Sequence, residues 1–388
     1  MADVYIVSAC RTPIGNFQGQ FDKFSAAELG SIVIAEAVKR AGLQPENVDQ
    51  VIMGQVLVAG QGQNPGRQAA VGAKIPYTTP AYTINMLCGS GLKAVALGYQ
   101  AIKLGDNEII VAGGQESMTR AEHTAYVRSG KFGNLTLADT LLKDGLHDAF
   151  NKDTHMGNTA EHLSKLYNIP RELQDEYSCE SQIKAEVSIK QGLFEKEIVA
   201  VPQKRTGTLI TTDEFPRFGT ALEKLSKLKS CFIPNGTVTP GNSSGINDGA
   251  AAVLLVNEKQ LKEKELTPLA KIVGFAEVGV DPMCMGTGPI GAVNNLLKKI
   301  GWSKEDVDLF ELNEAFAVQS LVVNNALGID KSKINITGGA IALGHPVGAS
   351  GTRILVTLIH NLLRLNKKKG IASLCIGGGM GIAMAIEL

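Results

Sequence analysis

The stretch Gly42-Leu-Gln-Pro-Glu-Asn-Val-Asp-Gln-Val51 has a counterpart 259 residues later, Gly301-Trp-Ser-Lys-Glu-Asp-Val-Asp-Leu-Phe310. Gly, Glu, Val and Asp coincide at four of the ten positions. A segment with the apolar spacing of a helix precedes each stretch, at 26–39 and 290–299, and an apolar run typical of a strand follows each. The pattern predicts an α/β unit that occurs twice in the chain.

A second similarity indicates the same duplication. Ile109-Ile-Val-Ala-Gly-Gly114 aligns with Ser373-Leu-Cys-Ile-Gly-Gly378 at an offset of 264 when the Gly-Gly pairs are matched. Each segment is predicted to be a buried strand that ends in glycine. We therefore expect the two strands to be equivalent members of the two units.

The sequence changes character between the two units. Residues 119–245 are mostly short polar segments, with one charged helix predicted over 171–191, and the apolar run at 246–257 suits a buried strand of the first unit. Pro268 marks the joint between the units, because proline resists continuing a preceding helix. We predict an α/β fold of layered helices and mixed sheets, with an N-terminal half (1–118 plus 246–267), an inserted loop lobe (119–245) and a C-terminal half (268–388).

The charge balance argues against several kinds of partner. The 388 residues include 38 Lys and Arg and 38 Asp and Glu, so no global attraction draws the protein to nucleic acid or to an acidic membrane. The apolar, glycine-rich end at 371–388 is predicted to form two buried strands. The residues around Val4 do not resemble a secretion signal, so we expect none, and no two of the six cysteines have metal-ligand or redox-pair spacing. We expect a cytoplasmic protein without a metal site.

Cys88 is a candidate nucleophile. It lies in Asn85-Met-Leu-Cys-Gly-Ser-Gly91, directly before a helical pattern over 92–104. Helix N-termini and neighbouring cations can lower a thiol pKa from about 8.5 to about 7, which predicts an activated thiolate here. The glycines leave backbone N–H groups free to bind an oxyanion. The alternative is a buried, inert cysteine.

Three more residues could complete such a site. His345 lies in a glycine-rich loop over 338–351 and could accept a thiol proton, or could simply satisfy the loop backbone. Cys375 ends a buried run before three glycines, where it could act as a second thiol base or pack within a strand. Asn313 follows the strand of the second unit, where its amide could hold a water molecule or cap a helix with Glu314 in the first turn.

Together, the four motifs around Cys88, Asn313, His345 and Cys375 resemble the thiolases, and the resemblance covers essentially the whole chain. It is closest to the biosynthetic acetyl-CoA C-acetyltransferases of that family, which carry Met-x-Cys-Gly-Ser-Gly-Leu-Lys around the first cysteine. It implies the reversible condensation of two acetyl-CoA to acetoacetyl-CoA plus CoA. No cofactor is implied, since CoA is substrate and product. A degradative 3-ketoacyl-CoA thiolase of broader chain length is the main alternative, and a carrier without turnover is another.

The resemblance also implies roles for the reactive residues. Cys88 would take up the acetyl group while His345 accepts its proton, and the backbone N–H groups of Cys88 and Gly377 would hold the acyl oxyanion. Cys375 would then remove a methyl proton from the second acetyl-CoA. His345 and a water molecule held by Asn313 would stabilise the enolate that results.

The inserted lobe resembles the CoA-binding region of the family. Arg217 and the Ser244 segment would contact the nucleotide and pantetheine ends, and Met156 and Met285 would shorten the acyl pocket. The other predicted CoA contacts are Leu146, His155, Leu225, Phe232, Ala315 and Phe316. The stretch 120–137 resembles the arm through which tetrameric members pair their dimers, so the resemblance implies a homotetramer, a dimer of dimers.

Overall fold

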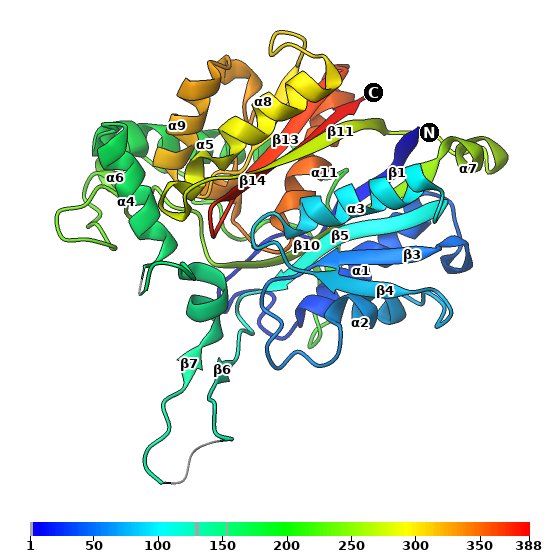
Figure 1. Ribbon diagram of the computed structural model, residues 1–388, viewed down its shortest axis with the longest axis horizontal. Helices are drawn as coiled ribbons and strands as arrows, with labels where there is room; N and C mark the ends of the chain where they lie inside the picture. Colours follow the sequence, from blue (N-terminus) through cyan, green and yellow to red (C-terminus); the bar gives the residue numbers. More distant parts are fainter. Residues whose placement is uncertain (1–2, 129–131, 153) are drawn as a thin grey trace.

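The computed structural model describes residues 3–128, 132–152 and 154–388, which form a mixed sheet covered by helices (Figure 1). The sheet order is β12-β13-β14-β11-β1-β10-β5-β3-β4, with the short β2 (Gly15–Asn16) beside β10. Its strands are β1 (Val4–Arg11), β3 (Gln50–Gly54), β4 (Ala81–Ile84), β5 (Ile109–Ser117), β10 (Asn247–Asn257), β11 (Ala270–Gly279), β12 (Leu309–Leu312), β13 (Lys369–Ile376) and β14 (Met380–Glu387).

The strand pairing repeats from one half of the sheet to the other. β5 runs parallel to β3 and antiparallel to β10, which is antiparallel to β1. In the same way, β13 runs parallel to β12 and antiparallel to β14, which is antiparallel to β11. The two sets join through two residue pairs between β1 and β11. This repeat confirms the predicted duplication, while the exact predicted division at residues 119, 246 and 268 stays a prediction.

The first sequence similarity marks equivalent positions in the two halves. Gly42 and Gly301 follow equivalent helices with φ of +69° and +72°, the left-handed conformation that glycine adopts at helix ends. Asp49 accepts hydrogen bonds from the N–H groups of residues 108 and 109 at the start of β5. Asp308 accepts them in the same way from residues 368 and 369 at the start of β13.

The alignment predicted from the second similarity is wrong by four residues. The contacts of Asp49 and Asp308 align residue 109 with residue 369, an offset of 260 rather than 264. Gly113 and Gly114 lie inside β5 and pair with β10, whereas Gly377 follows the end of β13. Glycine is needed at 113 because a Cβ atom there would lie 2.3 Å from a carbonyl oxygen of β10. The two Gly-Gly pairs therefore serve different purposes.

The helices form three layers around the two halves of the sheet (Figure 1). The central layer, α3 (Ser90–Leu104) and α11 (Ser350–Leu365), contacts strands of both halves and is buried along most of its length. The N-terminal outer layer is α1 (Ala26–Arg40) and α2 (Pro65–Gly72), and the C-terminal one is α8 (Gly288–Ile300) and α9 (Ala317–Leu327). The largest hydrophobic cluster combines both central helices with strands of both halves. A helix surrounded in this way must be apolar on most faces, as α3 is.

The inserted lobe packs beside the C-terminal half. It contains α4 (Met156–Leu166), the predicted charged helix α5 (Arg171–Lys190), α6 (Leu222–Leu225), the strand pair β8 (Val201–Pro202) and β9 (Leu209–Ile210), and a π-helix at Leu141–Leu146. A hairpin with β6 (His123–Thr124) and β7 (Ala138–Asp139) projects far from the body (Figure 1). The remaining elements are α7 (Glu258–Glu263), α10 (Ala340–Leu343) and three short 3-10 helices, Pro45–Asn47, Pro282–Thr287 and Lys331–Lys333.

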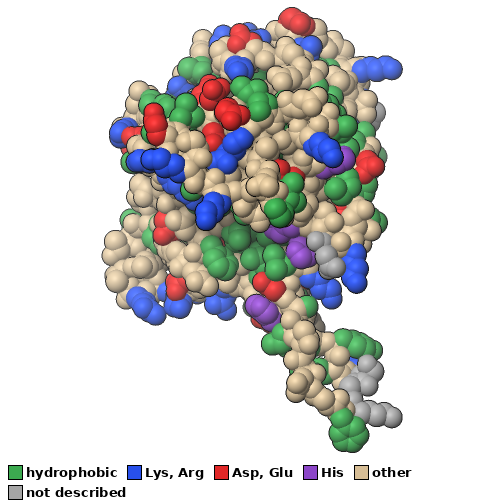
Figure 2. All heavy atoms as spheres, turned by 90° about the vertical axis from the view of Figure 1, so that its left-hand side faces the viewer, with side chains coloured by type: hydrophobic (Ala, Val, Ile, Leu, Met, Phe, Trp, Pro, Cys, Tyr) green, Lys and Arg blue, Asp and Glu red, His purple; other side chains and the backbone are tan. Residues whose placement is uncertain are grey.

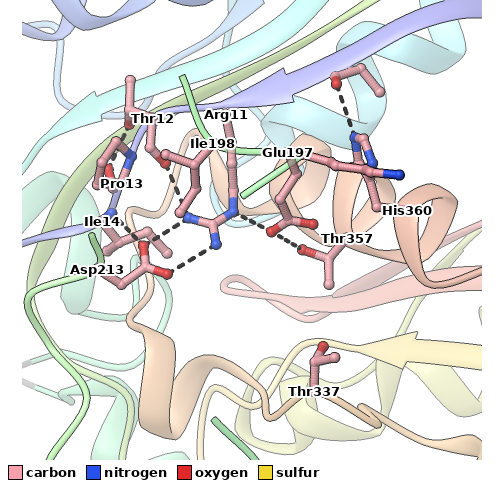
Figure 3. A network of polar contacts seen from close by, with 12 residues as sticks. Arg11, Thr12, Pro13, Ile14, Glu197, Ile198, Asp213, Thr337, Thr357 and His360 are labelled. Carbon is pink, nitrogen blue, oxygen red and sulfur yellow. Dashed lines mark hydrogen bonds and ion pairs between the residues drawn. The ribbon is translucent and has the colours of Figure 1, made fainter. Parts of the chain in front are cut away.

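A buried ion pair ties this lobe to β1. The Arg11 guanidinium lies between Asp213 (2.7 Å) and Glu197 (2.5 Å) of the lobe, and Thr357 of α11 donates a hydrogen bond to Glu197 (Figure 3). Arg11 is fully buried, so removing one partner would leave an uncompensated charge in the interior. Among the residues described, no helix has the length and apolarity needed to cross a bilayer, and the predicted buried strands at the C-terminus are β13 and β14.

Candidate active site

Three reactive side chains from distant parts of the sequence line one cavity. Cys88, His345 and Cys375 all border a space of about 740 Å³ between the inserted lobe and the two halves. On the face shown in Figure 2, hydrophobic and His side chains gather near the base of the projecting hairpin. A largely apolar cavity with a few convergent reactive groups is the usual form of a small-molecule site.

Cys88 lies in a tight turn directly before α3. The Ser90 hydroxyl donates to the Leu87 carbonyl (2.7 Å) and accepts from the Met86 N–H (2.8 Å), which pins the turn around the thiol. Leu87 has a φ of +47°, an uncommon value for a residue with a side chain. The thiol is partly exposed to the cavity and accepts a hydrogen bond from the Gly377 N–H. Gly377 is thus placed where its N–H could contact an acyl oxygen on this sulfur.

The expected thiolate is not present in the free chain. Burial raises the pKa of the Cys88 thiol to about 11, although the N–H of Gly377 opposes the shift. The charged group that acts on it most is Glu116, which raises the pKa further. The prediction that the start of α3 would lower the pKa of Cys88 is therefore wrong, because the loss of solvation outweighs the backbone N–H groups of Gly377 and Cys88. Activation requires a neighbouring base.

His345 can be that base, because Ser350 fixes which of its ring nitrogens carries the proton. The Ser350 hydroxyl donates its single proton to the Pro346 carbonyl (2.9 Å), so at 2.6 Å from the ring it must accept from Nδ1–H. Nε2 then carries the free lone pair, and it has no hydrogen-bond partner among the described residues. Burial, and next the positive charge of Arg353, lower the pKa of His345 to about 3, so the ring is neutral. The alternative that this ring satisfies the loop backbone is wrong.

Two further residues hold the His345 loop, and the sequence analysis missed both. Asn247, at the start of β10, accepts the backbone N–H of His345 (2.9 Å), and Glu116, in β5, accepts that of Gly348 (2.9 Å). Neither residue lies in a recognisable motif. A weak signal existed for Ser350, since Ser-Gly opens both central helices at an offset of 260, at Ser90 and Ser350.

Cys375 approaches the same space from β13, which ends one residue later. Its side chain is 1% exposed. Burial raises its pKa well above the ordinary value, and the nearby Cys88 sulfur raises it further. Both thiols are therefore protonated in the free chain, and they are close enough to influence each other electrostatically.

Asn313 lies in the loop between β12 and α9. Because α9 begins at Ala317 with Phe316 as its N-cap, the alternative that Asn313 caps a helix is wrong. Its side chain is 1% exposed and does not line the cavity, and neither amide atom has a hydrogen-bond partner among the described residues. An unpaired buried amide costs roughly 1–3 kcal/mol, so hydrogen bonds to a buried water molecule would stabilise the Asn313 side chain.

Most of the predicted CoA contacts border the cavity. Those that do are Leu146, His155, Met156, Arg217, Phe232, Ser244, Met285, Ala315 and Phe316. Leu225 lies outside the lining: it is buried within the lobe, and its carbonyl accepts a hydrogen bond from Arg171. The structure adds residues that the sequence analysis did not name, chiefly Phe17, Met118, Phe215 and Val347.

His155 presents a defined donor to this groove. Its Nδ1 accepts the Gly157 N–H at 3.0 Å, so the proton of the neutral ring is on Nε2. Burial lowers the pKa of His155 to about 4, with a smaller effect from His147. The ring also stacks on Phe232 with centroids 4.8 Å apart. Within the described residues, no three His, Cys, Asp or Glu side chains are arranged to hold a metal ion.

Comparisons with known proteins agree along the whole chain. Family models for the thiolase N-terminal and C-terminal domains match residues 4–259 and 266–388. The chain is 54% identical to an acetyl-CoA acetyltransferase of Cupriavidus necator, covering 100% of both, and 53% identical to the cytosolic acetyl-CoA acetyltransferase of Rattus norvegicus, covering 99% and 98%. The crystal structure of the Bacillus anthracis acetyl-CoA acetyltransferase superposes with a TM-score of 0.97 at 43% identity, covering 100% of this chain and 99% of that one.

Proposed function

The chain belongs to the thiolase family, and from this premise we propose that it is an acetyl-CoA C-acetyltransferase. The reaction joins two acetyl-CoA molecules into acetoacetyl-CoA, releases CoA and is reversible. Full-length relatives at 53–54% identity carry that name, which supports the assignment. The observation that carries it is the meeting of two thiols and one neutral imidazole at a single cavity.

The first half-reaction moves the acetyl group onto Cys88. As its sulfur attacks the thioester carbonyl, the thiol proton passes to Nε2 of His345, and the carbon–sulfur bond to CoA breaks. The departing CoA thiolate takes the proton of Cys375, because the raised pKa of that thiol keeps it protonated until this step. The N–H groups of Cys88 and Gly377 support the developing oxyanion, a contribution that is typically worth ~10²–10³ in rate for one donor. The products are acetyl-Cys88 and free CoA.

The second half-reaction forms the carbon–carbon bond. The Cys375 thiolate removes a methyl proton from the second acetyl-CoA, and protonated His345 and a water molecule on Asn313 stabilise the enolate oxygen. The enolate carbon attacks the acetyl group, and the Cys88 sulfur leaves with the proton of His345. All groups return to their starting protonation states. The proposed steps require no metal or resident cofactor, because the side chains and CoA carry every proton and the acetyl group. CoA is both substrate and product.

The inserted lobe supplies the proposed binding groove for CoA. The Nε2–H of His155 and the backbone around Ser244 face the groove as polar contacts for the pantetheine amides, and Phe232 and Phe316 provide apolar walls. Arg217 is exposed at the cavity, which suits a phosphate group. Met156 and Met285 fill the inner end, so the proposal favours a short acyl chain.

Comparing thiolysis of C4 and C10 3-ketoacyl-CoA tests the assignment. The C4 substrate, acetoacetyl-CoA, should be cleaved with a kcat/KM at least about 100-fold higher, because a longer chain would collide with Met156 and Met285. A preference for C10 would instead indicate the degradative thiolase, an alternative that the acetyl-CoA acetyltransferase relatives do not favour.

We further propose a homotetramer in the cytoplasm. The hairpin that projects from the body carries exposed apolar side chains, Tyr126 (81%), Phe132 (103%) and Leu135 (68%), which suit a contact between copies (Figure 2). Residues 129–131 of the predicted arm lie outside the described residues. The rat and mouse relatives are named as cytosolic, which supports the proposed location.

A further inference from the structure

We propose that Glu314 is a positioning residue that holds the Asn313 amide in place for carbon–carbon bond formation and cleavage. The proposal rests on the function proposed above, since it assigns Asn313 to the enolate site. Glu314 does not border the cavity and touches no substrate. Its effect would act through the loop that carries Asn313, between β12 and α9.

The Glu314 carboxylate accepts four hydrogen bonds in the interior. One oxygen accepts from the Tyr177 hydroxyl (3.1 Å) and from Nδ2 of Asn335 (3.0 Å). The other accepts from the Ser181 hydroxyl (2.7 Å) and the N–H of Ile341 (3.2 Å). Glu314 is only 2% exposed. The donors come from α5, from the segment before α10 and from α10, so the carboxylate fixes its own loop to three other segments.

Asn335 extends this hold to the other side of Asn313. Its Oδ1 accepts the N–H of Leu312 (2.8 Å), and its Nδ2 donates to the Leu312 carbonyl (2.7 Å) as well as to Glu314. The residues before and after Asn313 are therefore fixed by one pair of side chains. The Asn313 side chain itself makes no hydrogen bond within the described residues, so its position depends on this frame.

The backbone at Gly339 packs directly against the Glu314 carboxylate. A Cβ atom on Gly339 would lie 2.1 Å from the carboxyl carbon of Glu314. The N–H of Gly339 donates to Ser181 (3.1 Å), which directs the hydroxyl proton of Ser181 toward Glu314. A glutamine at 314 would have the right size, but its NH₂ group would face donors on whichever side it lay, leaving buried N–H or O–H groups unpaired.

His345 does not depend on Glu314 in the same way. Its backbone is held by Asn247, its ring by Ser350, and its loop by the bond between Gly348 and Glu116. Losing the Glu314 frame should therefore displace the Asn313 amide and leave the base in place. The loss should therefore slow the second half-reaction and not the first, because only the carbon–carbon step uses Asn313.

The experiment measures both half-reactions in Glu314→Gln. Thiolysis of acetoacetyl-CoA, which expels an enolate, should fall about 100-fold, the typical loss for one oxyanion donor. Exchange of isotopically labelled CoA into acetyl-CoA, which breaks no carbon–carbon bond, should change less than about threefold. Ser181→Ala removes one donor to Glu314 and the acceptor of the Gly339 N–H, and it serves if Glu314→Gln does not fold. It should lower thiolysis about fivefold and leave exchange unchanged.

Glu161→Gln is the matched control. Glu161 is also buried and accepts backbone N–H groups, from Thr237 and Val238, but it lies away from the loop of Asn313. The ratio of thiolysis to CoA exchange in Glu161→Gln should equal that of the wild type. An equal loss of thiolysis and exchange in Glu314→Gln and Ser181→Ala would overturn the proposal, since a merely structural role lowers both. Absence of thiolysis in the wild-type protein would instead contradict the proposed function.

Discussion

Cys88 and His345 are both uncharged in the free chain, because burial disfavours the thiolate and the imidazolium alike. The pKa of Cys88 rises to about 11 and that of His345 falls to about 3. A standing ion pair between them is therefore unfavourable. The proton should move only as the thioester carbonyl accepts the sulfur electrons, so that the charge appears where the N–H groups of Cys88 and Gly377 can stabilise it.

The rate of acetyl-enzyme formation should therefore depend little on pH. If the proton passes directly from Cys88 to His345, no proton enters or leaves the protein, and the single-turnover rate should vary less than about threefold between roughly pH 7.5 and 9.5. Rapid quenching after mixing with acetyl-CoA measures this rate. If solvent removed the proton instead, the rate would rise about tenfold per pH unit below the raised pKa of Cys88.

The buried carboxyl group of Glu311 should make stability fall with pH. Burial raises its pKa from 4.5 to about 8, so the folded chain holds a proton that the unfolded chain has lost, and this stabilisation disappears as pH rises from about 4.5 to about 8. Below pH 6.5, His345 instead makes stability rise with pH, because its pKa is lower in the folded chain than in the unfolded chain. Between pH 6.5 and 8, Glu311 alone should lower the free energy of unfolding by about 1–2 kcal/mol.

Glu311→Gln isolates that effect. The amide still accepts the hydrogen bond from Asn361 but cannot ionise. Urea unfolding at several pH values should show a flatter dependence for this variant between pH 6.5 and 8. Identical slopes for the variant and the wild type would mean that Glu311 does not carry the proton.

At the scale of elements, the two central helices place the chemistry. α3 begins two residues after Cys88, and α11 begins five residues after His345. Their first turns meet closely, because a Cβ atom on Gly351 would lie 2.3 Å from the N–H of Leu92 in α3. Cys88 and His345 are thus brought together by the contact between equivalent ends of equivalent helices.

The equivalence of the halves can be tested at Asp49 and Asp308. Each carboxylate accepts two backbone N–H groups at the start of a central strand. Asp49→Ala and Asp308→Ala should each lower the free energy of unfolding by about 1–3 kcal/mol, and by similar amounts. Chemical denaturation measures both. A loss in only one variant would show that the second contact is not an equivalent of the first.

The sequence predicted the elements better than their exact register. Helices at 26–39 and 171–191 and the strands at the C-terminus appear almost as predicted, because apolar spacing reports which faces are buried. The alignment of the Gly-Gly pairs was wrong because the two pairs lie in different places. Gly113 lies inside β5, where β10 approaches too closely for a side chain, whereas Gly377 follows the end of β13. Such a difference depends on neighbours that are distant in sequence.

In the site, too, the sequence predicted what local motifs report and missed what depends on distant neighbours. Cys88, His345, Asn313 and Cys375 were found because each lies in a motif. Asn247 and Glu116 were missed because their importance comes from a loop about 100 and 230 residues away, as the contacts with His345 and Gly348 show. The pKa of Cys88 was predicted in the wrong direction because its burial cannot be read from local sequence.

At the scale of the molecule, the cavity exists because three parts meet: the two halves supply the reactive groups and the inserted lobe covers them. The projecting hairpin lies apart from this arrangement (Figure 1). Replacing its exposed aromatics with Tyr126→Ser and Phe132→Ser should halve the particle mass in light scattering and leave thiolysis within about twofold. Leu104→Ser, at an equally exposed residue of α3, is the control and should change neither. An unchanged mass in the double variant would contradict the role of the hairpin in assembly.

In the proposed reaction, the sulfur of Cys88 carries the acetyl group while that of Cys375 moves the proton. Peptide mass spectrometry after mixing the protein with acetyl-CoA tests it most directly, in the wild type, Cys88→Ala and Cys375→Ser. We expect one acetyl group on the peptide containing Cys88 in the wild type, none in Cys88→Ala, and a stable acetyl group without acetoacetyl-CoA formation in Cys375→Ser. An acetyl group on Cys375 in the wild type, or continued turnover by Cys88→Ala, would contradict it.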